Sequence, residues 1–227
     1  MKKDILSIRC KTCSAPLALL GNSLRSKTLT CQYCGTVMDS QDEFRAVYSF
    51  SNVQQPQTAL RIGMQGQVDG VTFQITGFVV YKSSYRGEVT KWLHFQCYSP
   101  THGYSHIIKM GERCLVLRRT HYLPDRNTWL LKKGDGFTAR ESLYVIDQFY
   151  FPEVFYAAGS LTETIKLRQR NKQCFAFAED GCFVSIQKRD VVEYYVGELT
   201  SLAEMEAIFS EMAQAHLLMP RLPESDI

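Results

Sequence analysis

The chain has 227 residues, of which 45% are hydrophobic and 22% charged, so its composition is that of a folded globular protein and not of a disordered one. Its 26 basic and 23 acidic residues leave a net charge of +3, which is too balanced to indicate nucleic-acid binding by itself. No segment approaches the roughly 20 apolar residues that a membrane span requires, and the N-terminus lacks the apolar core of a signal peptide. We therefore expect a cytoplasmic protein with no transmembrane segment.

Four of the eight cysteines form two C-x2-C pairs that are separated by 17 residues. Two residues between cysteines let one tight turn aim both sulfurs at one point, and two such turns complete a tetrahedron of thiolates. Free cysteine pairs or a redox dithiol are the alternative, which the paired spacing disfavours. Four thiolates leave no open coordination position, so we expect one structural Zn²⁺ and no catalytic metal. The predicted metal ligands are Cys10, Cys13, Cys31 and Cys34.

The distribution of cysteines and polar residues divides the chain into three parts. Residues 1–40 are predicted to form a zinc ribbon that owes its folding free energy to the metal, with a hairpin made by 16–20 and 27–30. Residues 41–58 have the composition of a linker, although the aromatic residues Tyr48 and Phe50 could anchor it. Residues 59–227 are predicted to be a β-rich domain.

Alternating apolar and polar residues predict antiparallel strands throughout the third part. Asp69-Gly70 is a strong hairpin signal, and Glu179-Asp180-Gly181 is predicted to be a three-residue hairpin with its glycine in the left-handed region. The predicted fold class is mainly β: a zinc ribbon, then an antiparallel sandwich or barrel-like body, then a C-terminal α-helix. The strands are expected within residues 60–68, 71–77, 92–98, 104–110, 114–118, 142–151, 161–169, 174–178, 182–186 and 191–196.

A C-terminal helix is predicted to begin at Ser201. Ser201 and Glu204 form a capping-box pattern, in which each side chain accepts a hydrogen bond from the other residue's backbone N–H. Apolar residues then recur at helical spacing, which favours packing of one face on the body over a free partner-binding helix. This apolar stripe comprises Leu202, Met205, Ile208, Phe209 and Met212.

The remaining cysteines are single residues in apolar strand contexts. We interpret them as buried thiols, because free cysteine is among the most buried residue types. The alternative is a second metal site with His94, His102 or His106, which we otherwise expect to be surface histidines. The sequence contains no G-x-S-x-G, H-E-x-x-H, P-loop or kinase motif. The four single cysteines are Cys97, Cys114, Cys174 and Cys182.

Two groups of basic residues are candidate binding surfaces. The first group falls on every second residue, which would place its members on one face of a strand and make an anion-binding or partner-binding surface. The second group surrounds Tyr122 and Trp129, and basic residues beside aromatics are typical of single-stranded nucleic-acid sites. Lysines that protect a sheet edge are the alternative. The first group is Lys166, Arg168, Arg170 and Lys172; the second is Arg118, Arg119, Arg126, Lys132 and Lys133.

Several segments resemble a bacterial group, the domain-of-unknown-function family 4178, whose members often carry a four-cysteine ribbon before a body of this kind. The resemblance lies in residues 60–66, 70–77 and 92–95 and in the segment from Gly103-Tyr104 to Arg118, and more weakly in 144–159 and 194–197. The family has no established activity, so it assigns no catalytic residue. Its members look like parts of envelope-stress gene sets, which implies a cytoplasmic role beside the inner membrane.

Three functions are compatible with these patterns. The first, which we favour, is a noncatalytic zinc-binding adaptor whose ribbon and body bind protein partners. The second is a zinc-ribbon protein that binds nucleic acid or an anionic membrane surface, which strong salt dependence would reveal. The third is an enzyme whose site the sequence does not disclose, which a cleft with converging acid and base groups would reveal.

Overall fold

The computed structural model describes residues 7–50, 52–85, 87–188 and 191–217, and these form a mainly antiparallel β structure with one α-helix near the C-terminus. Fourteen strands belong to one sheet, in the order β11-β12-β14-β15-β16-β10-β9-β8-β7-β13-β3-β4-β5, with β6 paired to β7. Strands β1 and β2 form a separate pair. The elements are β1 Ser7–Arg9, β2 Pro16–Ala18, η1 Ser23–Arg25, β3 Thr28–Thr30, β4 Thr36–Asp39, β5 Arg45–Ser49, β6 Gln65–Val68, β7 Val71–Tyr85, β8 Glu88–Ser99, β9 Gly103–Met110, β10 Arg113–Thr120, η2 Thr128–Leu130, β11 Gly136–Ala139, β12 Ser142–Tyr150, β13 Glu153–Leu161, β14 Lys172–Phe177, β15 Cys182–Lys188, β16 Val191–Ser201 and α1 Leu202–Leu217.

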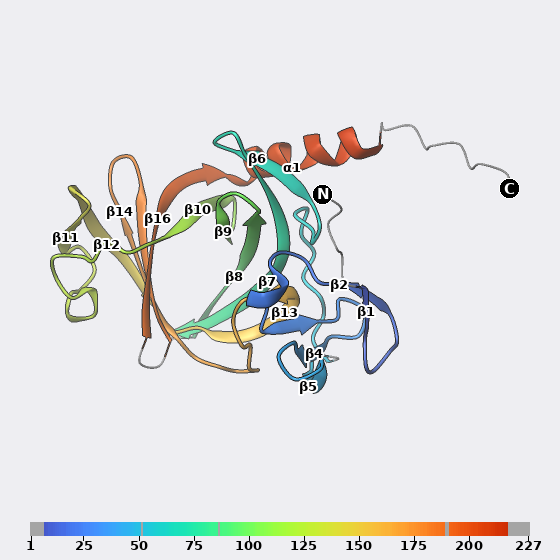
Figure 1. Cartoon of the computed structure of the whole chain (residues 1–227). Helices are drawn as coiled ribbons and strands as arrows, with labels where there is room; N and C mark the ends of the chain where they lie inside the picture. Colours follow the sequence, from blue (N-terminus) through green and yellow to red (C-terminus); the bar gives the residue numbers. More distant parts are fainter. Residues whose placement is uncertain (1–6, 51, 86, 189–190, 218–227) are drawn as a thin grey trace, which may run out of the picture.

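The large sheet curls so strongly that strands distant in its order face one another (Figure 1). The rings of Trp92 on β8 and Tyr150 on β12 lie 5.1 Å apart, although five other strands separate β8 from β12 in the sheet. An isolated bridge between Glu153 and Arg170 brings β13 close to the start of β14. The concave face is therefore enclosed and buries large aromatic side chains, which strands rich in aromatic residues provide.

The turn chemistry explains how neighbouring strands are joined. Asp69 and Gly70 have φ values of 50° and 73°, and they connect Val68 of β6 directly to Val71 of β7. This confirms the predicted two-residue hairpin, which needs two left-handed residues. The hairpin predicted at residues 179–181 is different: four residues separate Phe177 from its partner Cys182, and the glycine within them is not left-handed.

Helix α1 lies across the convex side of the sheet, on β6, β16 and β10 (Figure 1). The capping box is present, because Ser201 N–H donates to Glu204 Oε2 at 2.9 Å and Glu204 N–H donates to Ser201 Oγ at 3.2 Å. Met205 and Phe209 are buried in the main core, with Leu202 and Ile208 packed against it, so the predicted stripe covers the body. The side chain of Met212 lies outside the described part of the molecule.

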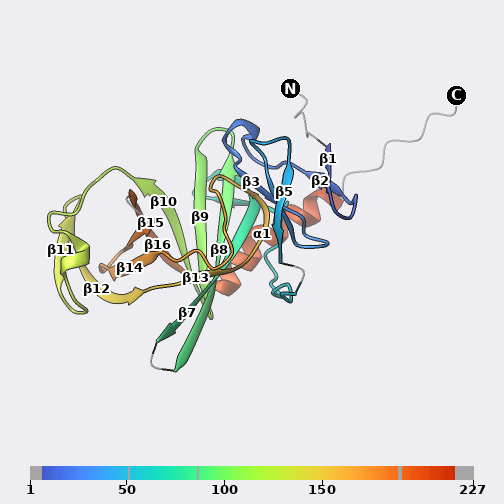
Figure 2. The ribbon, with the colours of Figure 1, turned by 90° about the horizontal axis from the view of Figure 1, so that it is seen from below.

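Strands β3 and β4 of the cysteine ribbon belong to the large sheet, whereas β1 and β2 form their own pair. The predicted hairpin of 16–20 with 27–30 is wrong, since β2 pairs with β1 and β3 pairs with β4 on one side and β13 on the other. The alternation of polar and apolar residues in Thr28–Thr30 is typical of a half-exposed strand, yet all three residues are buried. Figure 2 shows the ribbon strands beside the curled sheet. Strand β3 of the ribbon pairs directly with β13 of that sheet.

The segment predicted as a linker holds strand β5, which pairs with β4 and ends at the buried residue Phe50. Tyr48 donates its hydroxyl hydrogen to the carbonyl oxygen of Ile165 at 2.7 Å, and the Phe50 ring lies 5.3 Å from that of Tyr156 on β13. These aromatic residues anchor the segment, as its sequence suggested they could. Its polar composition reflects an edge strand, because one side of β5 pairs with no other strand in the described sheet.

Candidate metal centre and charged clusters

Two tight turns position the four N-terminal cysteines. In the first, Ser14 N–H donates to Cys10 O and Cys10 N–H donates to the carbonyl oxygen of Ala15, both at 2.9 Å. In the second, Gly35 N–H donates to Cys31 O and Cys31 N–H donates to the carbonyl oxygen of Thr36, again at 2.9 Å. Each turn reverses the chain within five residues, which aims both of its cysteines to the same side.

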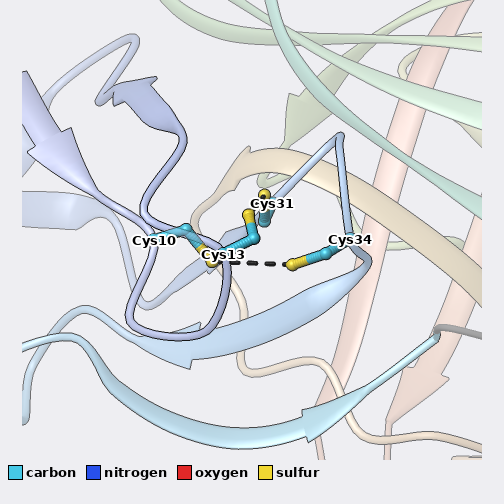
Figure 3. Close-up of side chains that lie close together, drawn as sticks. All are labelled: Cys10, Cys13, Cys31 and Cys34. Carbon is cyan, nitrogen blue, oxygen red and sulfur yellow. Dashed lines mark hydrogen bonds between the residues drawn. The ribbon is translucent and has the colours of Figure 1, made fainter.

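The four sulfurs converge on one point (Figure 3). All four Sγ atoms lie within 4.8 Å of one another. The Cys10 and Cys34 sulfurs are 3.6 Å apart, and the Cys13 and Cys31 sulfurs are 3.7 Å apart. A regular tetrahedron with sulfurs about 2.3 Å from its centre has edges of about 3.8 Å. The cluster therefore has the dimensions of a four-thiolate metal site and can hold a metal ion.

The cluster lies on the edge of a small apolar core. Cys10 and Cys31 are buried, Cys34 is half-buried and Cys13 is exposed. The backbone behind the second turn is tied to β5, because Phe50 N–H donates to Gly35 O at 2.9 Å. We therefore expect a conformational change in this turn to disturb the packing of Phe50 in the main core. The apolar residues packed beside the sulfurs are Leu17, Leu19, Leu29 and Met38.

The thiols of the cluster have different pKa values because their surroundings differ. Burial, with hydrogen bonds from the neighbouring sulfurs, raises the pKa of Cys31 to about 12. Burial would also raise the pKa of Cys34, but hydrogen bonds from the hydroxyl and backbone N–H of Thr36 outweigh it and lower that pKa to about 6. A metal ion must therefore displace the proton of Cys31, which makes its binding stronger as pH rises.

The four single cysteines do not join a second cluster. Cys97, Cys114, Cys174 and Cys182 are all buried and free, in agreement with their interpretation as interior thiols. Burial raises the pKa of Cys97 to about 12, so it stays protonated at neutral pH. Among the described residues, the N-terminal cysteines are the one group of three or more potential ligands.

Two histidines were expected on the surface, but they lie on the concave face of the sheet. His94 is only 7% exposed, and its Nε2 atom lies 3.1 Å from Nδ1 of His106. Burial lowers the pKa of each to about 3, assisted by the nearby charge of Lys188 and, for His106, by His94 itself. Both imidazoles are therefore neutral at neutral pH. The prediction of surface histidines holds for His102, which is exposed.

A network of ion pairs lies beside the histidines and was not foreseen from the sequence. Lys188 Nζ contacts Glu163 Oε2 at 2.7 Å and Glu193 Oε2 at 2.9 Å, and the Tyr195 hydroxyl donates to Glu193 at 3.0 Å. Burial would lower the pKa of Lys188, but the carboxylate of Glu163 and its neighbours hold it well above its usual value. The residues come from separate segments, so no local motif marks them. The network neutralises a cation inside the curl.

The first basic group does not lie on a strand. The predicted strand 161–169 is wrong after Leu161, since the chain leaves β13 there and makes a turn in which Arg168 has a φ of 57° and Gln169 N–H donates to Lys166 O. All four basic residues are exposed, but only Lys172 belongs to a strand, β14. The alternating charge therefore reflects an exposed loop. The side chains of Arg170 and Lys172 line one groove, which neither Lys166 nor Arg168 lines.

The second basic group is partly neutralised by acidic neighbours. Arg118 contacts Asp69 at 2.9 Å, Arg119 contacts Glu193 at 3.7 Å, and Lys133 contacts Asp147 at 3.5 Å. Tyr122 is 55% exposed, but its ring already faces the guanidinium of Arg140 at 5.4 Å. Three of the five basic residues in this group are therefore paired with carboxylates, whereas no ion pair is seen for Arg126 or Lys132 in the described part of the chain.

Comparison with protein-family models, curated proteins and solved structures finds no match for this chain. In the described part of the chain, no helix combines the length and apolar character of a membrane span.

Proposed function

We propose that the four-cysteine cluster binds one structural Zn²⁺ and that the protein is a noncatalytic, zinc-stabilised adaptor. The observation that carries the proposal is the pair of sulfur separations of 3.6 and 3.7 Å, which are close to the edge of a zinc–thiolate tetrahedron. Zinc is the metal that four-thiolate ribbons with this spacing most often hold. Four protein ligands complete the coordination shell, so the ion's role is to stabilise the fold.

The adaptor role is supported by apolar side chains that the ribbon leaves exposed. Leu24 is 91% exposed and Tyr33, within the second knuckle, is 65% exposed. Aromatic and aliphatic side chains of this kind act as anchors in protein–protein interfaces. A metal-fixed turn holds Tyr33 in one place, which reduces the entropy lost on binding.

The resemblance to the domain-of-unknown-function family 4178 supports the same role. That family pairs a four-cysteine ribbon with a β-rich body and carries no known catalytic residues. Membership would make this protein a cytoplasmic component of a bacterial envelope-stress system, whose partner is a protein that recognises the ribbon.

The metal is tested by elemental analysis of the purified full chain. We expect one zinc per chain, and we expect Cys13→Ser and Cys31→Ser to remove it because each leaves an incomplete tetrahedron. Cys97→Ala is the matched control, since it removes a buried sulfur outside the cluster and should retain the metal. Full zinc in Cys31→Ser, or another metal at full occupancy in the wild type, would contradict the assignment.

The adaptor role is tested by quantitative affinity purification from the native host. Proteins retained by the wild type should be lost with the double variant Leu24→Ala plus Tyr33→Ala, which should keep its zinc because neither residue is a ligand. A control variant, Leu143→Ala, removes a side chain that is 63% exposed on β12, far from the ribbon in sheet order. Equal retention by both variants would reject the ribbon as the adaptor surface.

A further inference from the structure

A row of basic side chains crosses one face of the sheet near the ends of several strands. Lys91 of β8 lies directly opposite Lys82 of β7, which in turn lies opposite Glu153 of β13. Glu153 also forms a bridge with Arg170, and Lys172 follows two residues later. Directly opposed residues of antiparallel strands point to the same face. We define the basic row as Lys91, Lys82, Arg170 and Lys172.

Glu153 lies between Lys82 and Arg170 and offsets one of the four positive charges of the basic row, which leaves a net positive charge. No ion pair joins any of its four members to a carboxylate among the described residues. Like charges directly opposite each other, such as Lys82 and Lys91, destabilise a sheet. Both ammonium groups instead rest over the ring of Phe155, at 5.9 and 4.5 Å from its centre. A bound anion would relieve this repulsion.

The surface around the basic row is hollowed on both sides of the two lysines. A groove of about 710 Å³ is lined by Lys82, Arg170 and Lys172, by the carboxylate residue Glu153 between them, and by Ser84, Phe151 and Asn171 among others. A second hollow of about 420 Å³ is lined by Lys91 and Phe155. Phe151 is 59% exposed at the edge of the first groove. Cations, hydrogen-bonding side chains and an open aromatic face thus occur together.

We propose that the basic row binds single-stranded nucleic acid. Its cations, spaced across strands that lie about 4.8 Å apart, would follow the phosphates, and a base would stack on Phe151. The aromatic face distinguishes this ligand from an acidic peptide, which needs only the charges. The site goes beyond the adaptor role and lies on β7, β8 and the start of β14, away from the cysteine cluster.

Fluorescence anisotropy with labelled 15-nucleotide oligo-dT and oligo-U tests the proposal and compares DNA with RNA. Four phosphate contacts predict a slope of about −2.8 in log affinity against log salt concentration. Lys82→Glu plus Arg170→Glu should weaken binding at least about tenfold, because it removes two contacts and adds repulsion. The matched control, Arg61→Glu plus Lys132→Glu, makes the same change in net charge at exposed sites outside the row and should retain most of the affinity.

Phe151→Ala separates nucleic-acid binding from simple attraction of anions. It should weaken oligonucleotide binding several-fold with an unchanged salt slope, and it should leave polyglutamate binding unaffected. The proposal is overturned by equal losses in the two charge-reversal variants, by no oligonucleotide binding at low salt, or by stronger binding to polyglutamate or anionic vesicles. Zinc content and circular dichroism establish that each variant is folded, so failure here is distinct from failure of the zinc assignment.

Discussion

The lowered pKa values of His94 and His106 predict that these two residues contribute to the loss of stability in acid. Their pKa values fall to about 3 in the folded protein, whereas an unfolded histidine has a pKa near 6.5. Between these values the unfolded chain binds more protons than the folded one, so stability is lost as pH falls below about 6.5. Two such groups steepen the dependence of unfolding free energy on pH by up to about 2.7 kcal/mol per unit.

We expect His94→Gln plus His106→Gln to be less stable at pH 7 but to show a shallower loss of stability between pH 6 and pH 4. Urea unfolding at several pH values measures this slope directly. His102→Gln is the control, because it removes an exposed imidazole that lies outside the pair. Parallel pH profiles of the wild type and the double variant would show that the buried pair does not govern acid sensitivity.

Ser201 offers a second prediction for a single side chain. Its Oγ atom accepts a hydrogen bond from Glu204 N–H, and its own N–H donates to the Glu204 carboxylate. Ser201→Ala should therefore lower the free energy of unfolding by roughly 0.5–2 kcal/mol. Chemical denaturation measures the change, and Ser210→Ala, at an exposed helical position, should lie within about 0.5 kcal/mol of the wild type.

Single residues differ in how far the sequence could assign them. The cysteine positions follow from spacing, because both members of each pair sit in one local turn. His94 and His106 meet only after β8 and β9 pair, and Lys188 meets Glu163 only when the sheet curls. Such contacts leave no local signature, and each of these residues taken alone resembles a surface residue.

Among the elements, helix α1 depends on a close approach to β6. A Cβ atom placed on Gly66 would lie 2.9 Å from side-chain atoms of both Ile208 and Phe209. Gly66→Ala should therefore push the helix outward and cost roughly 1–3 kcal/mol. Thermal unfolding measures the cost. Gly136→Ala is the control, since its added Cβ would lie 3.3 Å from the flexible end of Leu143 and 3.7 Å from the carbonyl oxygen of Tyr144 and should cost less.

Turns and caps that depend on residues close in sequence are found where they were predicted. Predictions that depend on strand pairing are not confirmed in the same way. Asp69-Gly70 and the capping box act within a few residues and are both observed where predicted. The segment after Leu161 alternates charged residues like a strand, yet its backbone bonds irregularly to β13: Arg168 N–H donates to Val154 O. The partner of a strand depends on residues far away, so β3 was assigned the wrong neighbour.

At the scale of the whole molecule, strands β3 and β4 of the ribbon continue the large sheet of the body, so we expect the ribbon and the body to unfold together. Saturation of a site at about 1,000 times its dissociation constant adds about 4 kcal/mol of stability. Removal of the metal should then lower the melting temperature of a chain of this size by about 8–16 °C. The change should include the body, because β3 pairs with β13 and Phe50 packs in the main core.

Tryptophan fluorescence with and without a chelator measures this coupling. The two tryptophans, Trp92 and Trp129, both lie outside the ribbon, so their signal follows the body alone. Cys31→Ser should melt at the chelated temperature and show no further response to the chelator. If the melting temperature measured by tryptophan fluorescence did not change on metal removal, the ribbon would fold independently of the sheet.

The pairing of β3 with β13 also determines how the chain tolerates truncation. Strand β13 pairs with β7 on one side, as far as Gly159 opposite Gly77, and its residues 159–161 pair with residues 28–30 of β3 on the other side. Removal of the first 40 residues would leave the second side with unsatisfied amide and carbonyl groups next to Leu161, which is 2% exposed in the intact chain. A bare apolar edge of this kind recruits strands from other molecules. The shortened protein should therefore aggregate, and its insolubility would reflect a lost neighbour rather than a lost metal.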